Sequence, residues 1–299
     1  MQFHETSKTK WQGCTDSNRG PSVLETDALP TELHPYRQPR LYNAFAAMAS
    51  DDMHCACYAT QMHAPPTPPA SPKIIPPEVL LLAYRSGVFP MADSRDDDEV
   101  FWVEPRNRAI LPLDGFRCSR SLAKVLKSGR FQVKVDGDFS AVIDACAQPR
   151  TDHPDTWISH AVDASYRNLH RHGHAHSVEC WQDGALVGGL YGVAFDRAFC
   201  GESMFTRADN ASKIALAWLV ALMRRAGYVL LDCQFMTDHL ASLGAVEITR
   251  ERYQELLAQA AEEPPRLSLI DAHRALYQES VAGSSSPGKL IAHSFSQTS

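Results

Sequence analysis

The segment HSVECWQDGALVGGLYGVAFDRAFCGESM, residues 176–204, decides the fold. It holds three runs rich in apolar residues and separated by short turns, at residues 176–181, 185–194 and 198–204. Asp183-Gly184 suits a two-residue hairpin turn, because aspartate and glycine accept the positive φ angles that such a turn requires. The sequence therefore predicts a meander of three antiparallel strands.

The residues that follow the meander predict a helix, a strand, a short helix and a final strand. The long helix covers residues 210–226 and stops at Gly227, since glycine accepts the left-handed conformation that commonly ends a helix. Strand-like runs at residues 228–234 and 245–248 flank a short helix near residues 239–243. This order of elements predicts an α+β fold whose main domain is acetyltransferase-like (GNAT-related).

The rest of the chain divides by composition. Residues 73–150 alternate short helical and strand-like runs and predict a smaller α/β N-terminal domain, ahead of the acetyltransferase-like domain at 151–262. Residues 1–72 are rich in proline and lack apolar periodicity, so we expect them to be disordered. Residues 263–299 include the Ser/Gly-rich run 283–287, which predicts a loose C-terminal tail.

Composition limits the classes of function. The 299 residues carry a net charge of −6, so any contact with nucleic acid needs a local basic patch. The eight cysteines follow no disulfide framework and no signal peptide is evident, which predicts reduced thiols and a cytoplasmic protein. The longest apolar run, residues 214–223, is about half a membrane span, so we expect no membrane association.

Asp232 and Gln234 are the first candidate site residues. They lie two apart in an otherwise apolar strand, so they share one face of it. Polar side chains in such a strand need hydrogen-bonding partners or a functional role. A catalytic pair and a buried structural hydrogen bond both fit this pattern.

Glu202 is the second candidate. It lies within the apolar run FCGESMF, residues 199–205, directly after a glycine that would let another group approach the backbone closely. The carboxylate could hold a cation or an amine. It could equally pair with Arg207 or Lys213 and fix the long helix in place.

A basic helix is the third candidate. Arg120, Lys124 and Lys127 fall within about 60° of one another on a helical wheel, opposite an apolar side. Arg117 and Arg130 flank the helix, so five positive charges meet few local acids. Such a helix could bind phosphates, or it could be an ordinary solvated amphipathic face.

Metal and nucleotide sites are disfavoured. The alternating histidines of residues 170–176 could ligate zinc, but no Cys or carboxylate cluster stands at a matching spacing, which favours structural histidines. An acetyl-CoA enzyme with this strand order needs a Gly-rich turn before the long helix, and residues 205–213 contain no glycine. We therefore expect neither metal nor cofactor.

Together these segments resemble the leucyl/phenylalanyl-tRNA–protein transferases. The resemblance covers residues 74–262 in order and rests on short motifs at residues 83–90, 102–108, 119–121, 156–158, 173–177, 186–193, 201–205, 210–213, 232–234 and 239–248. Met91 stands where relatives often carry tryptophan. The run from His174 to Ile248 is specific enough to exclude coincidence.

The resemblance implies an aminoacyltransferase with leucyl-tRNA or phenylalanyl-tRNA as donor, and methionyl-tRNA as a poorer one. The acceptor would be a protein with an N-terminal Arg or Lys, which becomes marked for degradation through the N-degron pathway. The basic helix would then bind tRNA through Arg117, Arg120, Lys124, Lys127 and Arg130.

The resemblance also implies roles for individual residues. The donor side chain would enter an apolar pocket formed by Leu190, Phe199, Met204, Leu216, Leu219 and Leu231. Other substrate contacts are expected nearby from Met91, Trp102, Trp157, Tyr166 and Ser203. Asp232, acting with Gln234, would orient the acceptor amine and draw its proton, while Glu202 would hold the cationic acceptor or the terminal adenosine.

Other functions stay open on the sequence. An acyl-CoA-dependent N-acetyltransferase would use the same strand order, and an RNA-binding module would use only the basic helix. A covalent route through Cys233 or Ser203 is less favoured, because neither has an obvious base beside it in the sequence.

Overall fold

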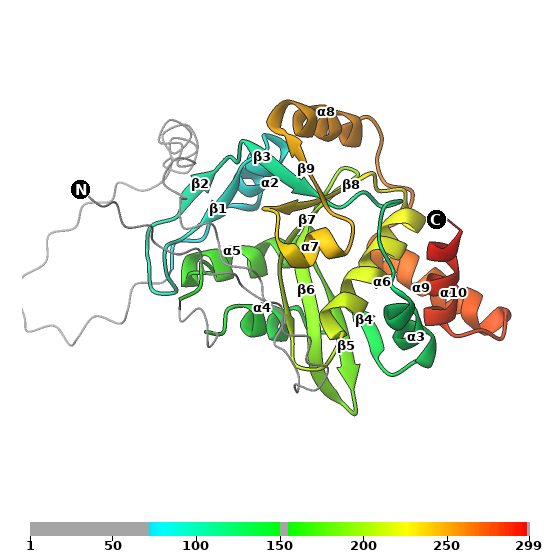
Figure 1. Ribbon diagram of the computed structural model, residues 1–299. Coiled ribbons are helices and arrows are strands. Elements are labelled where there is room, and N and C mark those ends of the chain that lie inside the picture. Colours follow the sequence, from blue (N-terminus) through cyan, green and yellow to red (C-terminus); the bar gives the residue numbers. More distant parts are fainter. Residues whose placement is uncertain (1–71, 150–154, 298–299) are drawn as a thin grey trace, which may run out of the picture.

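The computed structural model describes residues 72–149 and 155–297 (Figure 1). Its centre is a mixed seven-stranded sheet with the strand order β4-β5-β6-β7-β8-β3-β9, in which β7 and β8 pair in parallel and the other neighbours are antiparallel. The strands are β3 (Asn107–Ile110), β4 (Gln132–Val135), β5 (Ala175–Gln182), β6 (Ala185–Phe195), β7 (Ala198–Thr206), β8 (Leu230–Gln234) and β9 (Val246–Thr249). A separate two-stranded sheet pairs β1 (Phe89–Met91) with β2 (Phe101–Val103).

Helices cover both faces of the large sheet. One face carries α3 (Arg120–Ser128), α6 (Ala211–Ala226), α9 (Leu269–Ala282) and α10 (Pro287–Ser296), seen on the right in Figure 1. The core on the other face is completed by α2 (Pro77–Arg85), α4 (Phe139–Cys146), α5 (His160–Arg171) and α8 (Arg250–Ala261). The short α7 (Asp238–Ser242) connects β8 to β9.

The structure confirms the predicted α+β class and the order of elements around the meander. Asp183 and Gly184 adopt φ angles of 51° and 79°, as the hairpin turn between β5 and β6 requires. Gly227, with φ of 82°, ends α6 as expected. Both expected domains contribute strands to the large sheet. Strands β3 and β4 precede the expected boundary near residue 150, and the other five strands follow it.

The prediction of a loose C-terminal tail is wrong for most of that segment. Leu269 and Leu276 of α9 and Ile291 and Phe295 of α10 are buried in the same core cluster as α6. The Ser/Gly-rich run, which suggested disorder, only forms the turn between these two helices. Apolar spacing within the flanking helices, rather than the composition of the turn, determines the order of this segment.

Two further expectations concern the N-terminal segment and membrane association. The predicted disorder of residues 1–72 falls on residues 1–71, which lie outside the described residues. Within residues 72–149 and 155–297, none of the helices is both long enough and apolar enough to cross a membrane.

The packing of α10 leads to a stability prediction. The ring of Phe295 is 5% exposed and lies 4.9 Å from the ring of Phe116, measured between centroids. Phe295→Ala should lower the free energy of unfolding in urea by about 3–5 kcal/mol, because it leaves a cavity in the core. Val281→Ala, at a side chain that is 80% exposed on α9, should change it by less than about 0.5 kcal/mol. Equal, small effects would show that α10 does not pack as described.

Candidate active site

A buried ion pair joins two strands of the large sheet. Arg108 on β3 is 1% exposed and Asp232 on β8 is 0% exposed. Arg108 Nε donates to Asp232 Oδ1 at 2.8 Å, and Arg108 Nη2 donates to Oδ2 at 2.6 Å. This two-pronged geometry compensates part of the cost of removing both charges from water. The pair therefore fixes β3 against β8 with a defined register.

Three other segments complete the surroundings of Arg108. Its guanidinium lies between the rings of Phe89 and Tyr253, at 4.7 and 4.4 Å from their centroids. Arg108 Nη1 donates to the carbonyl of Gly87 at 3.1 Å, and the Tyr253 hydroxyl donates to Asp232 Oδ2 at 3.0 Å. The ion pair thus connects the turn after α2, strand β1 and helix α8 to the centre of the sheet.

Asp232 also shapes the backbone at the end of β8. Gln234 has a φ angle of 57°, which is uncommon for a residue other than glycine. Its backbone N–H donates to Asp232 Oδ1 at 2.9 Å, and this bond stabilises the turned conformation. The next residue, Phe235, packs edge-on against Phe89 with 5.8 Å between ring centroids. The backbone of Gln234 is therefore fixed by the Asp232 carboxylate before it and by the packing of Phe235 after it.

The side chain of Gln234 meets Glu202 from the neighbouring strand β7. Gln234 Nε2 donates to Glu202 Oε1 at 3.3 Å, and the Tyr166 hydroxyl donates to Glu202 Oε2 at 2.9 Å. The hydroxyls of Tyr166 and Tyr84 share a further hydrogen bond of 2.5 Å. Glu202 is only partly buried, so it can meet an incoming group.

Burial raises the pKa of Glu202 from its ordinary 4.5 to about 7, with the hydrogen bonds from Tyr84 and Tyr166 opposing the shift. A carboxyl group with such a pKa exists in both protonation states near neutral pH. It can therefore accept and release a proton there, as a general base requires.

The structure brings the three predicted catalytic residues together. Both oxygens of Asp232 are occupied by Arg108, Tyr253 and the backbone of Gln234. That Asp232 helps to draw the proton from the amine stays a prediction; in the structure its carboxylate is enclosed by these donors. Of the three, Glu202 is partly exposed, whereas Gln234 is buried and its side-chain amide contacts Glu202.

The residues predicted to bind substrate fall into two groups. Five of the six expected pocket residues are buried in the core on the α6 face: Leu190, Phe199, Leu216, Leu219 and Leu231. The sixth, Met204, is partly buried and packs against this core. Another group lies in the core on the opposite face, with partly buried Trp157 packed against it: Met91, Trp102 and Tyr166. Ser203, directly after Glu202, is partly exposed.

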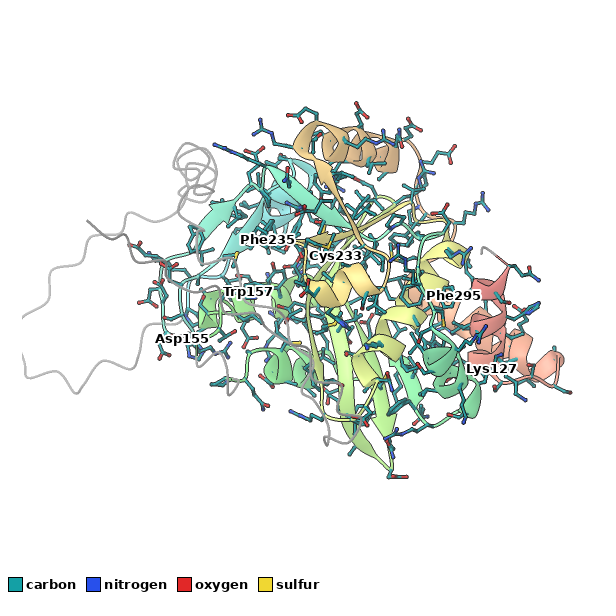
Figure 2. All side chains as sticks on the ribbon, viewed as in Figure 1. Lys127, Asp155, Trp157, Cys233, Phe235 and Phe295 are labelled. Atoms are coloured by element: carbon teal, nitrogen blue, oxygen red, sulfur yellow. The ribbon has the colours of Figure 1, made fainter. Side chains whose placement is uncertain are left out.

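The five predicted tRNA-binding residues are all exposed, as the helical wheel indicates: Arg117, Arg120, Lys124, Lys127 and Arg130. The opposite side of α3 is buried through Leu122 and Leu126. Figure 2 labels Lys127 on this helix, away from Cys233 on β8.

The structure shows the contacts of the histidines and of the cysteine that the sequence disfavoured as a zinc site and as a nucleophile. His176 Nδ1 lies 2.7 Å from a carboxylate oxygen of Asp136, and His170 Nδ1 lies 2.7 Å from the carbonyl of Ala175. Burial raises the pKa of the Cys233 thiol far above its ordinary value, which disfavours the thiolate that a covalent route would need.

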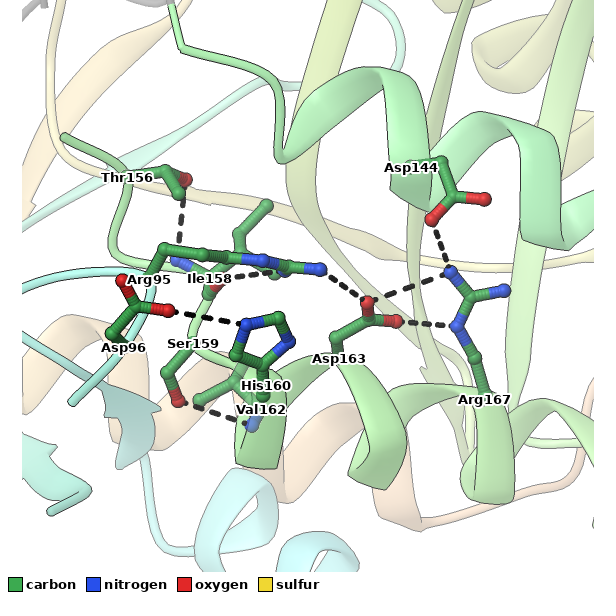
Figure 3. A network of polar contacts seen from close by, with 10 residues as sticks. All are labelled: Arg95, Asp96, Asp144, Thr156, Ile158, Ser159, His160, Val162, Asp163 and Arg167. Atoms are coloured by element: carbon green, nitrogen blue, oxygen red, sulfur yellow. Dashed lines mark hydrogen bonds and ion pairs between the residues drawn. The ribbon is translucent and has the colours of Figure 1, made fainter. Parts of the chain in front are cut away.

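A second network of charges positions α5, the helix that carries the tyrosine bonded to Glu202 (Figure 3). Arg95, from the loop between β1 and β2, donates to the carbonyl of Ile158 at 2.8 Å and to Asp163 at 2.9 Å. Arg167 donates to Asp163 at 2.5 Å and to Asp144 of α4 at 2.6 Å. The loop, α4 and α5 are thereby held together.

Sequence reasoning missed Tyr253 and Tyr84 and gave Arg108 no role. A charged residue directly before the apolar run Ala109–Leu111 was the one available signal for Arg108. Its partner lies 124 residues away, so local patterns could not identify the pair.

The sequence matches two family models. Residues 74–106 match the model described as "Leucyl/phenylalanyl-tRNA protein transferase N-terminal domain", and residues 110–258 match "Leucyl/phenylalanyl-tRNA protein transferase". A leucyl/phenylalanyl-tRNA–protein transferase from Novosphingobium aromaticivorans is 54% identical, over 76% of this chain and 98% of its own length. The chain belongs to this family. The family is one of aminoacyltransferases; Tyr166, Glu202, Asp232, Gln234 and Tyr253 lie inside the matched regions, and Arg108 lies between them.

Other family members are similar at the same level. The transferases of Rhizorhabdus wittichii and Zymomonas mobilis are 61% and 60% identical, each over 62% of this chain and over 75% and 70% of their own lengths. Among solved structures, L-PGS from Bacillus licheniformis aligns at 15% identity over 55% of each chain with a TM-score of 0.31, which is too low to assign a shared fold.

The buried ion pair leads to a second stability prediction. Arg108→Ala should lower the free energy of unfolding by about 3–5 kcal/mol, because it leaves the Asp232 carboxylate buried without its charged partner. Arg106→Ala, at an exposed arginine two residues earlier, should change it by less than about 0.5 kcal/mol. Urea unfolding of both variants makes the comparison. Similar stabilities for the two variants would contradict the assigned importance of the pair.

Proposed function

We propose that this protein transfers leucine or phenylalanine, and methionine less well, from aminoacyl-tRNA to the N-terminal Arg or Lys of acceptor proteins. The acceptors would thereby be marked for N-degron degradation in the cytoplasm, without a cofactor, a metal or a membrane. The observation that carries this proposal is the Glu202–Gln234 contact, held in place by Asp232 and Arg108. Membership of the transferase family supplies the donor and acceptor classes.

The division of labour along the chain is part of the proposal. Residues 151–262 would form a GNAT-related catalytic unit, supported by the order of β5, β6, β7, α6, β8, α7 and β9. Residues 73–150 would form the smaller N-terminal part, which supplies Arg108 to the site and the basic helix α3 to the tRNA.

The reaction needs little more than orientation and one base. The aminoacyl ester is already activated, and an α-amino group of pKa about 7.7–8.0 is partly neutral at pH 7. The Gln234 carboxamide oxygen would accept a hydrogen bond from this amine while its nitrogen donates to Glu202. The amine attacks the ester carbonyl, its proton passes to the Glu202 carboxylate, and the ester C–O bond breaks as the new C–N bond forms. The departing ribose oxygen takes up this proton from the Glu202 carboxyl, which returns to its carboxylate form.

Donor selectivity would come from apolar residues on the face of the sheet that carries Tyr166 and Glu202, because the expected set on the α6 face lies behind the sheet from them. Burial of a donor side chain against partly buried Trp157 would contribute about 25 cal/mol per Å² of apolar surface. A pocket of this kind distinguishes donors by shape, with about 1–3 kcal/mol for one methylene group.

Two alternatives predict different substrates. An acyl-CoA-dependent N-acetyltransferase would use coenzyme A, but the chain enters α6 without the glycines that would bring backbone N–H groups to a pyrophosphate. An RNA-binding module would need only α3, which leaves the Glu202–Gln234 pair without a role.

The direct test is transfer from radiolabelled phenylalanyl-tRNA to a peptide that begins with Arg. The wild-type protein should label the peptide, and Gln234→Ala should slow labelling by about 10²-fold, because the amine loses its positioning group. Gln254→Ala, a change at a glutamine that bonds only the Ser86 carbonyl, should keep most of the rate. Labelling from acetyl-CoA instead of tRNA, or full activity of Gln234→Ala, would refute the proposal.

The pKa of Glu202 gives a pH prediction. The value of kcat/KM should rise with pH through about 7 as Glu202 loses its proton, and Glu202→Gln should lack this step and retain only the titration of the amine. Because the folded-state pKa is raised, protonated Glu202 contributes stability that is present below pH 4.5 and lost by about pH 7. Unfolding of the wild type, but not of Glu202→Gln, should show this slope. Identical pH profiles for both proteins would remove Glu202 as the base.

A further inference from the structure

The basic helix belongs to a longer stretch without acidic residues. Residues 115–135 contain six basic side chains and no Asp or Glu: Arg117, Arg120, Lys124, Lys127, Arg130 and Lys134. The chain as a whole carries a net charge of −6, so this concentration of positive charge opposes the general field. Within the described part of the chain, no ion pair neutralises the five that lie on or beside α3.

Helix α10 packs directly on this basic helix. A side chain at Gly288 would overlap the carbonyl of Leu126, so the two backbones touch at this point. Near the C-terminal end of α10, the ring of Phe295 packs against the ring of Phe116, a residue that precedes α3 (Figures 1 and 2). Lys289 and Lys127 each directly follow a residue of this touching pair.

Helix α10 adds one further positive charge, Lys289. Lys289 is exposed, as is Lys127, and residues 280–297 contain no Asp or Glu. Helix α10 also lies beyond residue 258, where the match to the transferase family model ends. The contribution of α10 is therefore a feature of this chain outside the part that the family model describes.

The surface starts close to the candidate active site. Gln234 ends β8, and α7 begins four residues later, at Asp238. The carbonyl of Leu243, directly after α7, accepts a hydrogen bond of 2.8 Å from the backbone N–H of Arg117. One short helix thus separates the end of the catalytic strand from the first basic residue of the surface.

We propose that α3 and α10 form one surface for the phosphate backbone of the donor tRNA, with Lys289 as a phosphate contact supplied by the C-terminal helix. This inference rests on the proposed function, since it takes charged tRNA as the donor. Exposed lysines and arginines that face no acid bind phosphates with release of counterions, so their contribution falls as salt rises. Charge complementarity to a polyanion is the property that α3 and α10 share.

The test compares two donors that carry the same reactive ester. Phenylalanyl-tRNA has the phosphate backbone, whereas the 3′-phenylalanyl ester of adenosine has none. Lys289→Glu should lower the ratio of kcat/KM for the tRNA to kcat/KM for the adenosine ester by about three- to tenfold. It should also reduce the slope of log KM for tRNA against log salt concentration by about 1. Lys127→Glu, on α3, should act in the same direction.

The matched control is Arg171→Glu, the same charge reversal at an exposed arginine of α5 on the opposite face of the sheet, which should keep the wild-type ratio. A wild-type ratio and salt slope for Lys289→Glu would overturn the proposal while leaving the proposed function intact. It would also be overturned if Lys289→Glu and Lys127→Glu changed KM for an acidic acceptor protein and not for tRNA. If the wild type transferred from neither donor, the proposed function would fail and this inference with it.

Discussion

The pairing of Arg108 with Asp232 is the constraint on which the rest of the site depends. Two opposite charges without solvent access are stable together only while their hydrogen bonds are complete, and here every oxygen of the carboxylate is occupied. The same carboxylate holds the backbone of Gln234 in its turned conformation. A structural ion pair and the placement of a reactive side chain are therefore one arrangement. This is why residues from β3, α8 and the turn after α2 matter to chemistry at the end of β8.

Sequence patterns predicted the features that depend on neighbouring residues. The turn at Asp183-Gly184, the end of α6 at Gly227 and the common face of Asp232 and Gln234 follow from local conformational preferences and strand alternation. The contacts of Arg108 could not be predicted in this way, because its partners lie far along the chain. Asp232 was recognised as important, but its enclosure by donors became visible only in three dimensions.

At the C-terminus, apolar periodicity predicts the ordered helices better than amino-acid composition does. A short run of serine and glycine suggested a loose tail, although the apolar residues on both sides, such as Leu276 and Ile291, have helical spacing and enter the core. For the substrate-binding set, family resemblance named residues without saying on which face of the sheet each lies. Strand alternation does say so, since Phe199 and Cys200 belong to the cores on opposite faces. Exposure of the basic side of α3 followed directly from its apolar periodicity.

The central claim is that Asp232 acts on the reaction through Gln234 and not by contact with substrate. A double-mutant cycle measures this most directly, with kcat/KM for labelled phenylalanyl-tRNA and an Arg-starting peptide determined for Asp232→Asn, Gln234→Ala and the double variant. If the account is right, Asp232→Asn will cost little further activity once Gln234 has been replaced. Rate losses that multiply, so that the double variant shows the product of the two single effects, would contradict it.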